Sequence, residues 1–128
     1  MTNLEELFSV GNISKEITVK NVTFRIAMLN VKVQQEALNG AVDTDPISHA
    51  LEIKKQTLAR AITHINGNTY IQDVNNPNPE TVKHLLEILN KLHFSVINAL
   101  YDQYNDMDEK IKQDMDDEVK KSSKNPGV

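Results

Sequence analysis

The stretch that says most about this chain is residues 54–67, which read KKQTLARAITHING. Its apolar side chains recur every three or four positions, the period of one face of an α-helix. The stretch ends in Asn66-Gly67, a pair that readily takes the left-handed backbone at which helices stop. Upstream, Asp45-Pro46 offers a capping carboxylate and a proline suited to the first helical turn. We therefore predict an amphipathic helix that begins near residue 46 and ends at Gly67.

Lys54, Lys55 and Arg60 lie beside the apolar stripe of this predicted helix. No aromatic side chain stands among them to stack a base, as sites for single-stranded nucleic acid require. We interpret the three residues as solvated flanks whose aliphatic stems cover part of the stripe. The whole chain carries 14 basic and 18 acidic residues, which gives a net charge of −4. That sign opposes broad contact with a phosphate backbone, so we expect no nucleic acid partner.

The apolar pattern before this helix has a period of two, which predicts strands. Lys20-Asn21 separates the two alternating runs, and asparagine tolerates the positive φ that a tight turn requires. We therefore predict a small β-hairpin. Its alternating apolar residues are Ile17, Val19, Val22, Phe24 and Ile26. A two-stranded hairpin is marginal in water, so helices or the sheet of a neighbouring subunit have to cover its apolar face.

The second half of the chain is predicted to be helical from Pro79 onward. Asn78 is suited to cap this helix, and Glu80 places a negative charge in its first turn. Glycine and proline are absent from there to about Lys121, so the sequence permits one long helix or two. A broad apolar face reaches Tyr104. Beyond it the stripe narrows to one apolar residue per turn, namely Met107, Ile111, Met115 and Val119.

These patterns predict a fold that is mainly α with a small β-hairpin, a helical domain with a long C-terminal helix. We divide the chain into a hairpin-plus-helices domain (1–105), an extended acidic helical arm (106–121) and a disordered tail (122–128). Eight Asp or Glu and five Lys residues lie between positions 101 and 128. The predicted core is Phe24, Ile26, Leu51, Leu58, Ile62, Ile65, Leu85, Leu89, Leu92, Val96, Leu100 and Tyr104.

Two interpretations of the arm stay open at this point. It is either an exposed helix end that carries i, i+4 ion pairs, or a coiled-coil arm whose narrow apolar seam holds a partner helix.

Several kinds of chemistry lack their residues in this sequence. Cysteine is absent, which excludes disulfides and thiolate nucleophiles and suits a reducing cytoplasm. The four histidines show no metal-ligand spacing. Residues 73–80, DVNNPNPE, begin like a calcium loop, but Pro77 stands where a ligand belongs. We predict no catalytic residues, no cofactor and no metal, and we expect no membrane partner because no apolar run approaches about 20 residues.

Three stretches resemble a known family. They are FRIAML (24–29), TLARAITHING (57–67) and INALYDQYNDM (97–107). With the hairpin and the helix that starts at Pro79, they resemble the small tail-assembly proteins of long-tailed bacteriophages, which include the tail assembly chaperones and the baseplate hub assembly proteins. The resemblance spans roughly residues 15–107. It implies that these stretches belong to a helical core and that the protein acts through contacts, not catalysis.

From this resemblance we predict a non-enzymatic tail or baseplate assembly protein, a chaperone or adaptor, that works in the host cytoplasm or stays in the virion tail. Its partners would be other tail or baseplate proteins in a homo- or hetero-oligomer. One alternative is a permanent structural subunit of the virion tail or baseplate, and another is a small phage-encoded regulator that binds a host protein. The predicted partner-binding residues are Ile17, Val19, Val22, Met107, Ile111, Met115 and Val119.

Overall fold

The computed structural model describes residues 3–42 and 45–123 of the chain. Its helices are α1 (Asn3–Phe8), α2 (Val31–Gly40), α3 (Pro46–Ala61), α4 (Pro79–Leu89) and α5 (Phe94–Ser123). Its strands are β1 (Ser14–Val19), β2 (Val22–Ala27), β3 (Ile62–Ile65) and β4 (Asn68–Thr69). Most of the predicted disordered tail, residues 124–128, lies outside the described residues, and α5 takes in positions 122 and 123.

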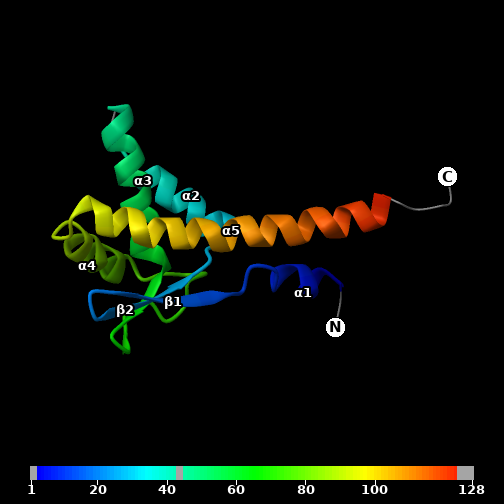
Figure 1. Cartoon of the computed structure of the whole chain (residues 1–128), viewed down its shortest axis with the longest axis horizontal. Helices are drawn as coiled ribbons and strands as arrows, with labels where there is room; N and C mark the ends of the chain where they lie inside the picture. Colours follow the sequence, from blue (N-terminus) through cyan, green and yellow to red (C-terminus); the bar gives the residue numbers. More distant parts are fainter. Residues whose placement is uncertain (1–2, 43–44, 124–128) are drawn as a thin grey trace.

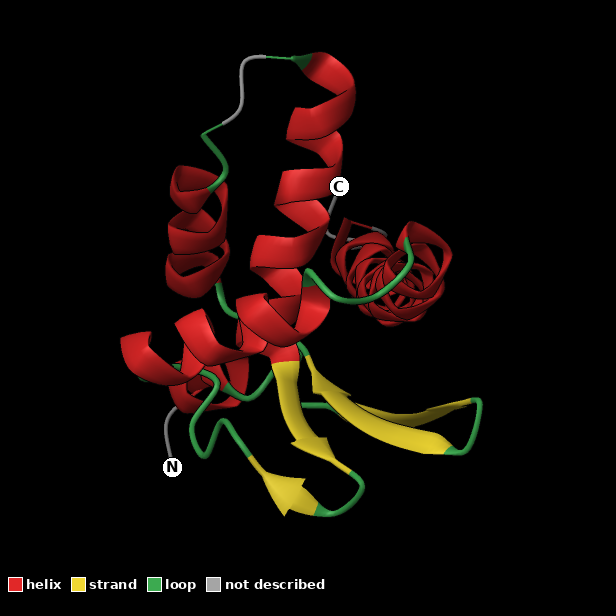
Figure 2. Ribbon diagram, turned by 90° about the vertical axis from the view of Figure 1, so that its left-hand side faces the viewer, coloured by secondary structure: helices red, strands yellow, loops and turns green. Residues whose placement is uncertain are grey.

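The strands form one antiparallel sheet in the order β1-β2-β3-β4. Helix α5 passes over the β1–β2 end of this sheet, and α2 and α3 stand side by side on the same side of the sheet (Figures 1 and 2). Helix α3 projects well beyond the other helices, and α5 extends beyond the sheet toward the C-terminus (Figure 1). The architecture is therefore a mixed α/β fold with a long C-terminal helix.

The predicted hairpin is present, with the predicted turn. Val19 pairs with Val22 and Ile17 with Phe24. Lys20 and Asn21 both have positive φ, 49° and 68°. Two consecutive left-handed residues match the type I′ turn, whose twist suits two antiparallel strands. The alternation of apolar residues was thus a reliable guide to the hairpin and its register.

The hairpin is only half of the sheet, so the predicted fold class is correct in part: the helices and the long C-terminal helix are present, but the sheet has four strands. We predicted that the helix through Leu58 would continue to Gly67, but α3 ends at Ala61 and Ile62–Ile65 form β3. Asn66 (φ 51°) and Gly67 (φ 82°) make the turn between β3 and β4. Isoleucine and threonine are β-branched and favour strands, and β2 offers an edge with which this segment pairs. Asn-Gly also starts hairpins as readily as it ends helices.

The helix starts were predicted with mixed success. The Asn78 side chain accepts a hydrogen bond from the Glu80 N–H at 2.9 Å, which confirms the predicted cap of α4. Asp45 makes no such bond to α3, and its carboxylate instead accepts one from the Ser48 hydroxyl at 3.1 Å. Asn30, which we did not single out, caps α2 by accepting the Val33 N–H at 3.0 Å.

The segment from Pro79 onward forms two helices, which settles a question that the sequence left open. Helix α4 ends at Leu89, and the Asn90 N–H reaches back to the Leu86 carbonyl oxygen at 2.9 Å. Helix α5 begins at Phe94, where the Ser95 N–H donates to Nδ1 of His93 at 3.1 Å. One backbone hydrogen bond and the His93 side chain thus satisfy backbone groups at the break without glycine or proline. Helix α5 has 30 residues and is about 45 Å long.

The core lies between the inner face of the sheet and helices α2 to α5. Eight predicted core residues are buried, and the other four pack against the core while partly exposed. The eight are Phe24, Ile26, Leu58, Ile62, Leu85, Leu89, Leu100 and Tyr104. Val33, Ile71, Val82 and Ile97 are also buried, although we did not name them as core.

Tyr104 places one polar group in this core. Its hydroxyl oxygen accepts hydrogen bonds from the Leu29 N–H at 3.4 Å and the Gln34 side-chain amide at 3.1 Å. Burial raises the pKa of the Tyr104 phenol above its usual 10.0, against the opposing effect of those two hydrogen bonds. The hydroxyl therefore ties α5 to the start of α2 in its protonated form.

The variant Tyr104→Phe is expected to lose about 1 kcal/mol of unfolding free energy near pH 7, because two donors lose their acceptor. Above about pH 10 the unfolded chain releases the phenol proton while the folded chain keeps it, so the wild type loses stability as pH rises. The variant lacks this contribution, and its stability should fall less steeply. Urea unfolding of the wild type and the variant, near pH 7 and above about pH 10, measures the two effects. Equal pH dependence of the two proteins would contradict the raised pKa of Tyr104.

Candidate functional site

The three predicted partner-binding residues of the hairpin pack against the protein's own core. Ile17, Val19 and Val22 are partly buried on the inner face of the sheet. Helix α5 covers this face, where Lys15 donates a hydrogen bond to Gln103 (Figure 2). The cover that a hairpin requires is thus provided within the chain, and what β1 presents outward is its backbone edge.

The four predicted residues of the arm divide into two pairs. Met107 is buried in the core, and Ile111 packs against it. Met115 is half-buried, and Val119 is 65% exposed on the part of α5 that extends past the sheet (Figure 1). The predicted seam is therefore continuous along α5, and its exposure is greatest at Val119.

An apolar groove lies where α1, the start of α2 and α5 meet. We call it the α1 groove; its volume is about 760 Å³. Phe8 is 72% exposed and Val31 is 81% exposed. Its principal apolar lining residues are Leu7, Phe8, Val10, Met28, Leu29, Val31 and Ile111. The predicted residue Ile111 thus forms one wall of the α1 groove, whose other wall comes from α1.

Sequence reasoning missed the α1 groove, although one signal for it was available. Leu4, Leu7 and Phe8 lie on α1, a helix of six residues. A helix this short is not stable alone and depends on covering its apolar face. In the structure these side chains remain exposed, so α1 presents the kind of surface that a partner would cover.

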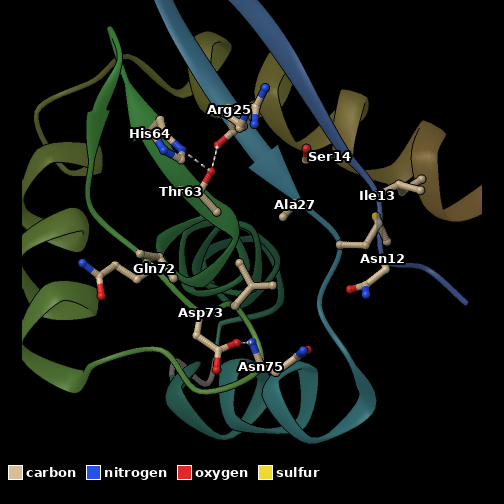
Figure 3. Close-up of a pocket in the computed structure, with 13 residues that line it drawn as sticks. Asn12, Ile13, Ser14, Arg25, Ala27, Thr63, His64, Gln72, Asp73 and Asn75 are labelled. Atoms are coloured by element: carbon tan, nitrogen blue, oxygen red, sulfur yellow. Dashed lines mark hydrogen bonds between the residues drawn. The ribbon is translucent and has the colours of Figure 1, made fainter. Parts of the chain in front are cut away.

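A polar cavity of about 320 Å³ lies beside the end of β2 (Figure 3). Thr63 Oγ1 donates to the Arg25 carbonyl oxygen at 3.3 Å and lies 2.8 Å from His64 Nδ1. Across the cavity, Asp73 accepts the Asn75 N–H at 2.9 Å. The first of these bonds joins β3 to β2, and the last closes a turn within the loop. Figure 3 shows the Asp73 carboxylate beside Asn75, on the opposite side of the cavity from His64, and not as its acid/base partner.

The described residues contain no group of histidine and carboxylate side chains arranged as a metal site. Among residues 3–42 and 45–123, no three His, Asp or Glu residues are placed to hold a metal ion. The segment 73–80, which begins like a calcium loop in the sequence, forms turns that lead to the Asn78 cap.

A second apolar groove lies at the other end of α5, in the angle between the start of α3 and the start of α5. We call it the α3 corner; its volume is about 640 Å³. Ile47 is 82% exposed and Phe94 is 57% exposed. On its wall, Lys54 Nζ donates to the Asn98 side chain at 2.9 Å and lies 5.7 Å from the centre of the Tyr101 ring. Its apolar lining residues are Pro46, Ile47, Ala50, Leu51 and Phe94.

Comparison with protein-family models, with curated proteins and with solved structures finds no match to this chain. In the described residues, no helix has both the length and the apolar character required to cross a membrane. The functional argument therefore starts from the surfaces themselves.

Proposed function

We propose that this protein is a non-enzymatic assembly protein of the bacteriophage tail or baseplate, a chaperone or adaptor that acts by binding other tail proteins. The α1 groove is the observation that carries the proposal, because it exposes several large apolar side chains together. Grooves of this kind mark protein contact sites. The resemblance of residues 24–29, 57–67 and 97–107 to tail-assembly proteins supplies the class of partner.

Burial of the α1 groove would contribute favourable free energy to a complex. Each large apolar side chain that becomes fully buried contributes about 1.5 to 3 kcal/mol. Leu7, Phe8 and Val31 all start from exposed positions, so a partner that covers them gains from each. At the edge of the groove, Lys32 and Asp108 offer polar groups that orient the partner.

Co-purification from infected cells tests this proposal. A tagged wild-type chain is expected to recover tail or baseplate subunits, which mass spectrometry identifies. The double variant Leu7→Ser, Phe8→Ser should recover them at least about tenfold less well, because two apolar contacts are lost. Val42→Ser is the matched control, since Val42 is exposed and does not line the groove.

The partners recovered also separate the alternatives. If purified virions contain the protein, it is a permanent structural subunit, and if they lack it, it is a transient assembly factor. Recovery of host proteins alone, equally with wild type and the groove variant, would contradict the proposal and favour the host-directed regulator.

A further inference from the structure

We infer that copies of this chain bind one another head to tail, with the acidic end of α5 from one copy lying in the α3 corner of the next. The contact involves only this chain, so it does not rest on the proposed tail function. The corner receives an apolar, negatively charged helix, and the chain itself contains one.

The α3 corner exposes large apolar side chains that a partner would bury. Ile47 and Phe94 come from different helices, and both expose most of their surface on the two sides of one groove. Helix α3 projects away from the body of the protein at this point, so a partner can reach the groove from the side (Figure 1). Apolar side chains that gather at an open groove are typical of a protein contact site.

The corner favours a partner with negative charge. Among the described residues that line it, the charged one is Lys54. The first turns of α3 and α5 contribute to the groove, and neither turn contains an acidic residue. Asp45 precedes α3 and accepts the Ser48 hydroxyl. His93 holds the corresponding position before α5, where its ring accepts the Ser95 N–H. The Asp45 carboxylate offsets the positive end of the α3 dipole, so the positive charge of the corner comes from Lys54 and from the start of α5.

The end of α5 has the complementary character. Met115 and Val119 are spaced by four residues, so they lie on one side of the helix about one turn apart. Asp116 and Glu118 lie beside this stripe, and Lys112, one turn before it, is paired with Asp108 and Glu109. Residues 106–121 carry seven Asp or Glu and four Lys, so this part of α5 is acidic. An apolar stripe with acidic flanks fits a groove with apolar walls and a lysine.

The positions of the two surfaces determine how copies assemble. The corner lies at the start of α5 and the acidic stripe near its end, at opposite ends of a helix about 45 Å long. A single copy cannot place its own stripe in its own corner. A contact between two different surfaces also leaves one corner and one stripe available in each dimer, so assembly continues to a closed ring or a filament.

Sedimentation velocity of the full chain over a range of concentrations tests this inference. The wild type is expected to grow past the dimer as concentration rises. A stripe variant (Met115→Gln, Val119→Gln) and a corner variant (Ile47→Gln, Phe94→Gln) each remove one surface without changing charge. Each alone should be monomeric, with a dissociation constant raised by roughly a hundredfold.

Mixing the two variants gives the decisive result. The stripe variant keeps an intact corner and the corner variant keeps an intact stripe, so an equimolar mixture should form a dimer and stop there. Lys54→Glu in an otherwise wild-type chain should weaken assembly about tenfold at low salt and less at high salt. Circular dichroism confirms that each variant is folded.

A wild type that stays monomeric at every concentration would overturn the inference. So would a mixture of the two variants that stays monomeric, since the two surfaces would then not meet. Neither result affects the co-purification experiment, which depends on Leu7 and Phe8 in a different groove.

Discussion

Leu58→Ala is expected to lower the free energy of unfolding by about 2 to 5 kcal/mol, the range for truncating a buried leucine. Leu58 is fully buried in the last turns of α3. Its carbonyl oxygen accepts a hydrogen bond from the N–H of Ile62, the residue that caps the C-terminal end of the helix. The cavity that this substitution creates lies at the junction of α3 and the sheet. The surrounding backbone is fixed by both elements, so it relaxes little into the space.

Urea unfolding followed by circular dichroism measures this loss. Leu38→Ala is the matched control, because Leu38 lies exposed on α2 and alanine is at least as good a helix former as leucine. We expect the control to change stability by less than about 1 kcal/mol. Equal losses in the two variants would mean that Leu58 is not at the centre of the core.

Gly67→Val is expected to cost about 2 kcal/mol, the largest effect we foresee for a residue on the surface. Gly67 has a φ of 82°, a backbone conformation that a β-branched residue strongly disfavours. A steric clash with neighbouring residues is not the cause, because a Cβ added at Gly67 would meet no atom within 4 Å. The penalty therefore reports the backbone of the β3–β4 turn alone.

Gly67→Asn is the control for this second prediction, since asparagine tolerates positive φ. It should unfold within about 0.5 kcal/mol of the wild type. If valine and asparagine proved equally harmless, the turn would not have the left-handed backbone described above. Thermal unfolding of both variants, at concentrations where the chain does not assemble, makes the comparison.

The sequence predicted those elements whose signals are local. The hairpin followed from alternation plus an asparagine at the turn, and the start of α4 followed from Asn78 before Pro79. Both depend on backbone geometry within a few residues. Most of the predicted core was also correct, because helical periodicity fixes which side of α5 faces inward, including Leu100 and Tyr104.

The features that sequence reasoning missed depend on contacts between distant segments. Ile62 continues the helical stripe of Leu58, so the stripe could not reveal that the chain turns into a strand there. The choice is made by β2, which is nearly 40 residues away and pairs with β3. Propensity decides little where a strand partner is available.

The two apolar grooves and the seam of α5 were predictable only in part for the same reason. Met115 and Val119 were found as a seam, since both lie on one helix. The α3 corner brings Ile47 beside Phe94, and no periodicity connects positions so far apart. The α1 groove likewise requires that α1 lie near Ile111. Such surfaces become visible only when the helices are placed in space.

The direct passage from Ala61 to Ile62 couples the orientation of α3 to that of the sheet. Helix and strand follow each other with no loop between them, and the helix extends about 24 Å from that junction to Pro46. Because no loop residue separates them, a tilt of α3 would also turn the first residues of β3. A force on the far end of α3 would therefore be shared between the sheet and the helices α2, α4 and α5 that pack against α3.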